Sequence, residues 1–388
     1  MKKLICVVCV FIMCFCLFPL NVLADDKEVS LLANAVSGVL INPENGEVIF
    51  SKDMNKKVAV ASMTKMVAQI IILEKIESGK IKWDDVVTVS KNAADMGGSQ
   101  IYIAEGEKIS VEDLMKGISM ASGNDATVAM AEYISGSESK FVQDMNKKVK
   151  ELGLKNTQFK NCTGLDEDGH YSSAYDMAVI AKELVTKHSE ILRFSSVYED
   201  YLREDTENEF WLVNTNKLVR FYEGADGLKT GFTDNAGYCL AATAERNGLR
   251  LIGIVLGEAN GSVRNNEMME LLDYGFNSLK VTTIKKKGEI IKKIKLDKAD
   301  SEIVDIVLMN DLNIVQKVDE ELGDYNYQIK INKIKLPIEV GDVIGKIEVY
   351  DKKAKIKEES LTVSKDIRLL SFGKLLINEL VDLISGDF

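Results

Sequence analysis

Cysteine is scarce outside the first segment of this chain. Four of the six cysteines lie within residues 1–24, and only Cys162 and Cys239 remain beyond it. A small secreted domain that depends on disulfides would carry several pairs. The sequence therefore excludes a disulfide scaffold, and the spacing of these two cysteines does not say whether they pair.

Histidine is scarcer still, with only His170 and His188. A Ser-His-Asp triad needs a histidine that can reach a nucleophile, and neither histidine has a nucleophile motif beside it. We expect both to be structural or to face solvent. The sequence also lacks clusters with metal-ligand spacing and a glycine-rich phosphate loop, so we expect no metal and no other cofactor.

The first 24 residues have the pattern of a secretory signal peptide. Lys2 and Lys3 precede an apolar run over residues 4–20, and residues 22–24 form a small-residue cleavage site. An uncleaved membrane anchor is the alternative. Cleavage would give a mature chain that starts near Asp25 and works outside the cytoplasm. It would also take the formal net charge from −11 to −13, which argues against binding nucleic acid by bulk charge.

Residues 25–280 show strand patterns, then helical patterns, then strand patterns again. Asn45-Gly46 predicts a hairpin, as does Asn247-Gly248 within a meander that begins near Ala225. This order predicts an α+β domain with one antiparallel sheet. The expected helices cover residues 62–76, 111–119, 125–134, 141–152, 174–185 and 266–279.

The remainder of the chain differs in composition. Residues 281–362 are rich in β-branched side chains and predict a small all-β domain, whose lysines would form a solvated face that protects strand edges. A polyanion-binding patch is the alternative. Residues 363–388 predict an amphipathic helix with too many charges to span a membrane. We expect it to lie on the outer face of the cytoplasmic membrane; docking on the protein's own core is the alternative.

A lone charge stands in the apolar run "VAVASMTKMVAQIIIL", where Ser62 precedes Lys65 by three positions. On a helix these two side chains share a face, and a helix that is apolar all round is buried. A buried ammonium must lose its proton or gain close partners. A neutral lysine is a base, and a serine beside a base is a nucleophile.

This spacing alone is weak evidence for a catalytic pair. Ser62 could be a helix N-cap and Lys65 a surface lysine with a buried stem. Ser137 and Lys140 have the same spacing in an expected polar loop, as do Ser371 and Lys374 in the expected terminal helix. Only the first pair lies at the start of an apolar helix.

Two further motifs strengthen the catalytic interpretation. Ser122-Gly-Asn124 falls in a break between two expected helices, although Ser90-Lys-Asn92 matches the same pattern. Lys229-Thr230-Gly231 occurs once, on an expected strand that would border a cleft. There the glycine would let a peptide approach the backbone, and the threonine would offer a hydroxyl. A capped turn and an ordinary exposed strand are the alternatives.

In this order, the three motifs resemble the signature of serine penicillin-binding proteins and β-lactamases. Longer stretches, including "SGNDATVAMAEYISG", "GLDEDGHYSSAYDMA" and "DGLKTGFTDNAGYCLAATA", resemble the low-molecular-mass penicillin-binding proteins that are D-alanyl-D-alanine carboxypeptidases. The resemblance covers about residues 30–280. The β domain and the amphipathic tail also fit the family's usual layout.

The resemblance implies a role for each motif. Ser62 would attack the carbonyl of the penultimate D-Ala of a peptidoglycan stem peptide, and Lys65 would accept its proton. Ser122 would relay a proton to the leaving amine, and Asn124 would hold the substrate. Lys229 would supply positive charge that helps to keep Lys65 neutral. β-Lactam antibiotics would acylate the same serine.

The resemblance also implies binding groups on the strand and beyond it. Thr230 and Gly231 would contact substrate, and the backbone N–H groups of Ser62 and Phe232 would form the oxyanion hole. Another residue is common in the family at the position of Phe232, which matters little if only its amide is used. Arg264 would lie near the substrate's terminal carboxylate.

Three rival functions stay open at this point. A D,D-endopeptidase on cross-linked peptidoglycan is the closest rival. A β-lactamase would need a Glu-x-x-Leu-Asn segment for deacylation, which we do not find. An inactive peptidoglycan-binding protein is the third rival, against which the intact motifs argue.

Overall fold

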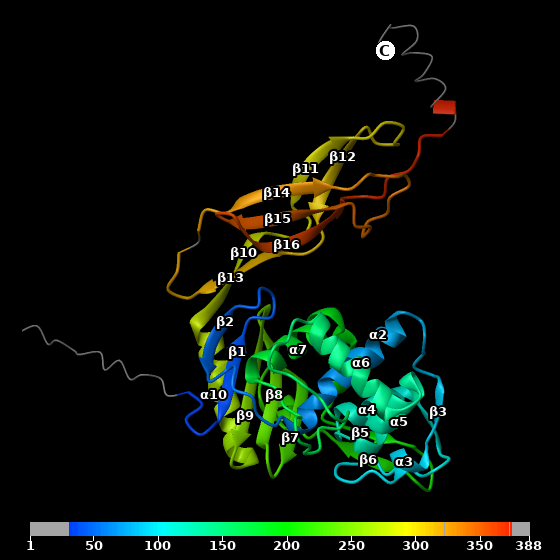
Figure 1. The fold of residues 1–388 in the computed structure, drawn as a ribbon. Helices are drawn as coiled ribbons and strands as arrows, with labels where there is room; N and C mark the ends of the chain where they lie inside the picture. Colours follow the sequence, from blue (N-terminus) through cyan, green and yellow to red (C-terminus); the bar gives the residue numbers. More distant parts are fainter. Residues whose placement is uncertain (1–30, 322, 372, 375–388) are drawn as a thin grey trace, which may run out of the picture.

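A five-stranded antiparallel sheet organises the first domain (Figure 1), in the order β2-β1-β9-β8-β7. The computed structural model describes residues 31–321, 323–371, 373 and 374. The first strand pairs with β9, so the two ends of the domain meet in the middle of the sheet. The strands are β1 (Ser37–Ile41), β2 (Val48–Lys52), β7 (Ala225–Thr233), β8 (Gly237–Arg246) and β9 (Leu249–Glu258).

Both predicted hairpins are present. Gly46 has a φ of 78° in the turn between β1 and β2. Asn247 and Gly248 have φ of 50° and 76° between β8 and β9, which is the left-handed pair that a two-residue hairpin turn requires. The predicted meander therefore closes as expected.

Helices cover the two faces of the sheet unequally. One face packs against a large core with several helices, and the other against α10 (Gly261–Ser278). Strand β9 is buried on both faces, with Ile252 in the first core and Leu251 in the second, so it lacks polar–apolar alternation. The larger helices of the first face are α2 (Lys65–Glu77), α4 (Val111–Ser119), α5 (Asn124–Ser135), α6 (Glu138–Glu151) and α7 (Ala174–Lys187).

Three short elements of this domain matter for the site. A 3₁₀ turn, η1 (Ala61–Thr64), precedes α2, so the expected helix from residue 62 begins with a tighter turn. A small hairpin is formed by β5 (Glu199–Leu202) and β6 (Phe210–Val213). The other short elements are β3 (Val86–Thr88), α3 (Lys91–Ala94), β4 (Lys108–Ser110), η2 (Ser189–Ile191), α8 (Leu192–Ser195) and α9 (Leu218–Phe221).

The expectation of a polar loop at residues 137–140 is wrong. The Ser137 hydroxyl accepts a hydrogen bond from the Lys140 N–H at 3.3 Å and caps α6. Gly136, with a φ of 79°, ends α5 directly before it. Polar residues that suggest a loop therefore form the start of a helix, because caps and loops favour the same residue types.

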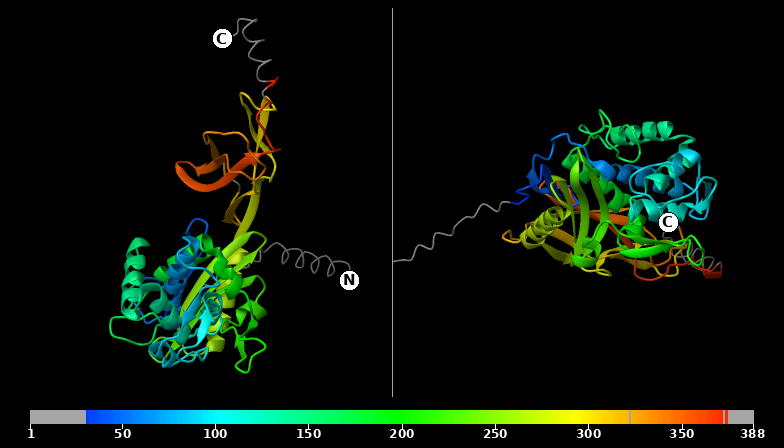
Figure 2. Two further views of the ribbon diagram at one scale, coloured as in Figure 1. Left: turned by 90° about the vertical axis from the view of Figure 1, so that its right-hand side faces the viewer. Right: turned by 90° about the horizontal axis from the view of Figure 1, so that it is seen from below.

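The second domain is all-β and stands beyond one end of the first (Figures 1 and 2). Its main sheet has the order β11-β12-β16-β15-β14, and β10 with β13 forms a two-stranded joint next to α10. The α+β fold with an all-β second domain is thus as predicted, while the domain boundaries stay predictions. The strands are β10 (Leu279–Lys285), β11 (Ile290–Lys295), β12 (Ile303–Leu308), β13 (Leu312–Lys317), β14 (Asn326–Ile331), β15 (Gly345–Asp351) and β16 (Ala354–Val363).

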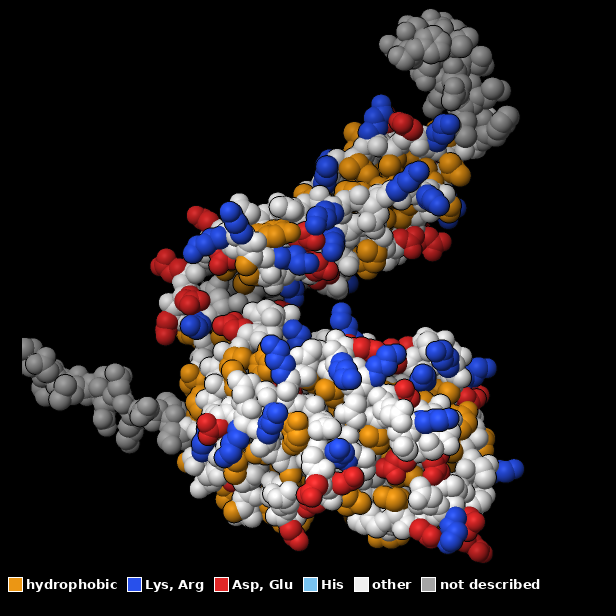
Figure 3. Space-filling view, in the orientation of Figure 1, with side chains coloured by type: hydrophobic (Ala, Val, Ile, Leu, Met, Phe, Trp, Pro, Cys, Tyr) orange, Lys and Arg blue, Asp and Glu red, His pale blue; other side chains and the backbone are white. Residues whose placement is uncertain are grey.

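Lysines of this domain lie among acidic side chains on the face seen in Figure 3. Glu348, for example, is within 2.7 Å of Lys330 and 3.3 Å of Lys346. This mixture agrees with a solvated face.

The expectation of a helix over residues 363–388 is wrong at its start, because Val363 ends β16 and Ile367 and Leu369 form isolated β-bridges with Ile338 and Ala299. The remainder of that expected helix, from residue 375, lies outside the described residues. Within the described part, no helix is long and apolar enough to cross a membrane.

Candidate active site

The backbone around Ser62 is tightly enclosed. Ser62 lies in η1 and is half-buried, after Ala61 in a left-handed conformation with a φ of 47°. A Cβ on Gly164 would lie 1.9 Å from the Ala61 carbonyl oxygen, and one on Gly231 would lie 3.2 Å from the Ser62 nitrogen. A Cβ on Gly231 would also lie 2.8 Å from the Val60 carbonyl oxygen, so only glycine fits at these two positions. Two segments distant in the sequence therefore pack directly against the backbone that carries the serine.

Lys65 begins α2 and is completely buried. Its Nζ lies 2.8 Å from Ser62 Oγ, 2.6 Å from Asn124 Oδ1 and 2.7 Å from the Thr163 carbonyl oxygen. Burial lowers the pKa of Lys65 from 10.5 to about 7, and the nearby Asp125 opposes this shift only in part. A large fraction of Lys65 is therefore neutral at neutral pH.

The three partners of Lys65 decide where its lone pair points. A neutral amine has two N–H groups and one lone pair, while the Asn124 and Thr163 oxygens can only accept. These two oxygens take the two N–H groups, so the lone pair faces the Ser62 hydroxyl, which can donate. This is the geometry of a base poised to take the proton of a nucleophile.

Asn124 is fixed by its own contacts. Its Nδ2 donates to the Gly97 carbonyl at 2.7 Å, which leaves Oδ1 toward Lys65. Its backbone N–H donates to the Ser99 carbonyl, also at 2.7 Å. The segment around residues 97–99 therefore sets the orientation of the amide that binds the lysine.

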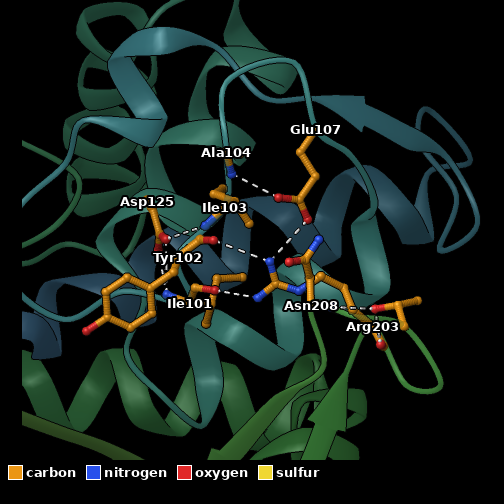
Figure 4. A network of polar contacts seen from close by, with 9 residues as sticks. Ile101, Tyr102, Ile103, Ala104, Glu107, Asp125, Arg203 and Asn208 are labelled. Carbon is orange, nitrogen blue, oxygen red and sulfur yellow. Dashed lines mark hydrogen bonds and ion pairs between the residues drawn. The ribbon is translucent and has the colours of Figure 1, made fainter.

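The segment of residues 97–103 is held by hydrogen bonds to Asp125 and from Arg203 (Figure 4). The Asp125 carboxylate accepts the N–H groups of Ile101, at 3.0 Å, and of Ile103, at 3.3 Å. Arg203, at the end of β5, donates to the Ile101 carbonyl at 2.7 Å. The β5–β6 hairpin is thereby linked through residues 97–103 to Asn124.

Ser122 lies in the break between α4 and α5 with a φ of 61°. It is 4% exposed, and its hydroxyl has no hydrogen-bond partner within the described part of the chain. A buried hydroxyl without a partner is costly, and residues in strained conformations concentrate at functional sites. This hydroxyl is free to exchange a proton with a bound molecule.

The Lys-Thr-Gly segment occupies β7, at the edge of the sheet beside η1. Lys229 is 1% exposed, and its Nζ donates to the Thr230 carbonyl at 2.9 Å. Burial lowers its pKa well below 10.5, and the positive charges of Lys65 and Arg264 add to this. The Thr230 hydroxyl donates to the Thr215 hydroxyl at 2.7 Å.

Burial is also the main reason why Lys65 loses its charge. The repulsion between the two lysines instead lowers the pKa of Lys229.

Phe232 directly follows Gly231 in β7, and Arg264 lies on helix α10. Phe232 is 51% exposed, and its ring centroid lies 4.3 Å from that of Tyr238, its partner across β7 and β8. Arg264 is in the first turn of α10, 7% exposed, and donates to the Cys239 carbonyl at 3.4 Å and to Asn265. The structure thus places Phe232 within the Lys-Thr-Gly strand and Arg264 against the neighbouring strand β8.

Comparison with known proteins agrees with this geometry. Residues 25–260 match the peptidase S11 family, described as D-alanyl-D-alanine carboxypeptidase, and residues 280–368 match the C-terminal domain of penicillin-binding protein 5. The chain belongs to the D-alanyl-D-alanine carboxypeptidase family.

Individual relatives of this family cover most of the chain. The chain is 46% identical to D-alanyl-D-alanine carboxypeptidase DacF of Bacillus subtilis over 344 residues, which are 88% of each protein. Penicillin-binding protein 5 of Haemophilus influenzae has a similar structure, with a TM-score of 0.65, 30% identity, and coverage of 86% of this chain and 98% of the other. Penicillin-binding protein D2 of Listeria monocytogenes, solved with ampicillin bound, has a TM-score of 0.57 and 31% identity and covers 62% of this chain and 97% of its own.

Two further groups that support this candidate site have no signal in the sequence. The Thr163 carbonyl that binds Lys65 carries no sequence signal, because any residue has a carbonyl group. His170 is buried, and its Nε2 lies 2.8 Å from the Thr64 hydroxyl. Its Nδ1 accepts the Lys160 N–H at 3.2 Å, so Nε2 carries the proton and donates to Thr64.

The neutral form of His170 is favoured, since burial lowers its pKa to about 4. It is a structural histidine, as expected, but it supports the turn that carries Ser62. Cys162 and Cys239 are separate buried thiols. No group of three or more candidate metal ligands occurs in the described part of the chain.

Proposed function

We propose that this chain removes the terminal D-alanine from peptidoglycan stem pentapeptides through an acyl-enzyme on Ser62. One observation carries the proposal: a fully buried lysine with a pKa of about 7 whose lone pair faces the serine hydroxyl 2.8 Å away. Family membership and the relatives named as D-alanyl-D-alanine carboxypeptidases support the reaction class.

Acylation begins when Ser62 Oγ attacks the carbonyl carbon of the penultimate D-Ala, while its proton passes to Lys65 Nζ. The carbonyl oxygen becomes an oxyanion, which the backbone N–H groups of Ser62 and Phe232 stabilise. The close approach of Gly231 to the Ser62 nitrogen, which would put a Cβ at 3.2 Å, supports this placement of the two amides. Preorganised donors of this kind are often the largest contribution to acyl transfer.

Collapse of the tetrahedral intermediate breaks the bond to the terminal D-Ala. Its nitrogen needs a proton, and the unpartnered Ser122 hydroxyl supplies one in a relay from Lys65. Lys229, Thr230 and Arg264 attract the terminal carboxylate of the leaving residue. Water then attacks the ester carbonyl and gives a proton to Lys65. As the ester bond breaks, Lys65 returns this proton to Ser62 Oγ and the tetrapeptide is released.

β-Lactams acylate the same serine in this scheme, because their amide imitates the D-Ala-D-Ala bond. The ampicillin-bound structure of the Listeria relative supports this extension. A D,D-endopeptidase uses the same chemistry on a cross-linked peptide, so the two functions differ in the leaving group that is accepted. We place the enzyme outside the cytoplasm, on the outer face of the membrane, on the basis of the signal peptide and amphipathic helix expected from the sequence.

Mass spectrometry of a stem pentapeptide incubated with the purified mature chain tests this function. We expect loss of one D-alanine, and no loss with Ser62→Ala. A fluorescent penicillin should label the native chain and leave the Ser62→Ala variant unlabelled. Labelling that persists in this variant would refute the role of Ser62. Faster cleavage of cross-linked dimers than of pentapeptide would assign the endopeptidase instead.

A further inference from the structure

The Thr163 carbonyl is one of the two acceptors that direct the Lys65 lone pair toward Ser62, and its oxygen lies 2.7 Å from Nζ. It belongs to the segment of residues 161–164, which lies outside the helices and strands. The regular hydrogen bonds of a helix or sheet therefore do not place this carbonyl. The direction of the lone pair depends on the side chains that hold the segment.

Part of this support is local. Asn161 Oδ1 accepts the Gly164 N–H at 2.8 Å and the Thr163 hydroxyl at 3.2 Å. These two bonds give the segment its shape, but they do not attach it to another element. The packing of Gly164 against the Ala61 backbone limits how closely the segment approaches, and it provides no hydrogen bond that would keep the segment there.

Glu138, the first residue of α6, makes an attachment of this kind. Its Oε1 accepts the Cys162 N–H at 3.2 Å and lies 3.3 Å from Cys162 Sγ. Burial, with a smaller effect of the Glu138 charge, raises the pKa of this thiol well above 9.0, so Sγ keeps its proton and can donate it. One carboxylate oxygen thus receives both donors of the residue that directly precedes Thr163.

Helix α6 is a firm base for this attachment. It packs against α2, the helix that Lys65 begins (Figure 1), and Phe141 of α6 and Met66 of α2 lie in the same buried core. Further along α6, Asn146 accepts the Phe159 N–H at 3.0 Å and donates to the Phe159 carbonyl at 2.8 Å. The chain that leads to the segment is therefore bound to α6 at two points.

We propose that Glu138 is a positioning residue for acylation. It holds Cys162, and the bound Cys162 keeps the Thr163 carbonyl where the Lys65 amine needs an acceptor. The carboxylate acts through its reach, because the two Cys162 donors require an acceptor oxygen at this point. Without that oxygen the carbonyl can move away, and the lone pair of Lys65 is then no longer directed at Ser62. This inference rests on the proposed function, in which Lys65 is the base.

Two variants of Glu138 separate reach from charge. Glu138→Gln keeps an acceptor oxygen at the same distance from the backbone and removes the charge. Glu138→Asp keeps the charge, which suits the first turn of a helix, but withdraws the acceptor by one methylene group. Ser137→Ala is the matched control, because it weakens the same helix start and leaves the contacts of Cys162 in place.

The pH profile of acylation by a fluorescent penicillin, measured on the full mature chain, tests the proposal. The native rate should rise with pH and level off above a pH of about 7, where Lys65 is neutral. Glu138→Asp should lower this plateau about tenfold, because a misplaced base is slow even when it is fully deprotonated. Glu138→Gln and Ser137→Ala should keep the native plateau. The urea midpoint of each variant records its stability separately.

Three results would overturn the proposal. A native plateau in Glu138→Asp would mean that Glu138 is only structural, whatever its urea midpoint. A plateau that falls as far in Glu138→Gln as in Glu138→Asp would mean that the charge matters and not the reach. An equal fall in Ser137→Ala would assign the effect to the helix start as a whole.

An NMR measurement separates this inference from the proposed function. Lysines labelled at Cε are observed at high pH, where Lys65 is neutral. Glu138→Asp should shift the Lys65 resonance, and Glu138→Gln should leave it in place. Failure of penicillin to acylate the native chain would count against the proposed function, while this resonance would still report on the surroundings of Lys65. An unmoved resonance in Glu138→Asp would overturn the inference itself.

Discussion

The Ser-x-x-Lys pairs at α2 and α6 both stand at the start of a helix, and only the pair at α2 has the surroundings of a catalytic pair. In the pair at α6, the Ser137 hydroxyl accepts the backbone N–H of Lys140, whose side chain is exposed. In the pair at α2, the Ser62 hydroxyl meets the Lys65 amine, which is 0% exposed. The same spacing therefore gives a helix cap in one place and a nucleophile with its base in the other.

The difference comes from what surrounds each helix. The α2 helix is enclosed by the main core, whose members include Met63, Met66 and Ile70, and burial there removes the hydration that stabilises an ammonium. The exposed ammonium of Lys140 keeps its water. The spacing of a motif indicates a possible catalytic pair, and the burial of the lysine determines whether that lysine can act as a base.

The largest difference in acylation rate is expected between variants that lack the amine of Lys65 and variants that lack the amine of Lys140. We expect Lys65→Ala to lower the rate of acylation by penicillin about 10²–10⁴-fold, since a general base contributes about that much. Lys140→Ala should leave this rate unchanged. The measurement is stopped-flow acylation with a fluorescent penicillin. Equal rates for the two variants would mean that Lys65 is not the base.

A charge placed beside Lys65 should shift its ionisation. Asn124→Asp puts a carboxylate where Oδ1 now lies 2.6 Å from Nζ, and an opposite charge favours the protonated amine, so the pKa of Lys65 should rise. Acylation at pH 7 should then fall about tenfold for each unit of rise. The rate should recover at higher pH, and a pH profile with the native midpoint would show that this contact does not tune the lysine.

Loss of Arg203, which binds the segment of residues 97–103, should have a smaller effect on activity. Arg203→Ala removes the donor to the Ile101 carbonyl and should destabilise the fold by about 1–3 kcal/mol. Because residues 97–103 orient Asn124, we also expect a several-fold loss in kcat with little change in KM. Arg203→Lys should recover part of the activity. Unfolding by urea and steady-state kinetics would separate the two effects, and a change in stability alone would mean that the support is only structural.

The smallest effect is expected for Ser137, which caps α6. Ser137→Ala should cost about 1 kcal/mol, the usual contribution of an N-cap, without any change in acylation. The shift in the urea midpoint measures this cost. A loss of activity in this variant would contradict the assignment of Ser137 as a cap.

Local patterns predicted much of the fold and singled out Ser62, Lys65 and Asn124, whose side chains meet in the structure. Strand β7 and helix α4 lie where the sequence places them, because period and turn residues are local signals. The loop expected at Ser137 was wrong, because a cap and a loop use the same residues. Contacts between residues about a hundred positions apart, such as Lys65 with Thr163 and Thr64 with His170, depend on packing and carry no local pattern.

Direct observation of the Lys65 side chain tests the account most closely. Lysines labelled at Cε can be followed by NMR as the pH rises, and the Lys65→Arg variant identifies the resonance by its disappearance. The structure predicts a midpoint at a pH of about 7. A midpoint near the ordinary lysine value of about 10.4 would mean that the amine stays charged beside Ser62, and the proposed base would be wrong.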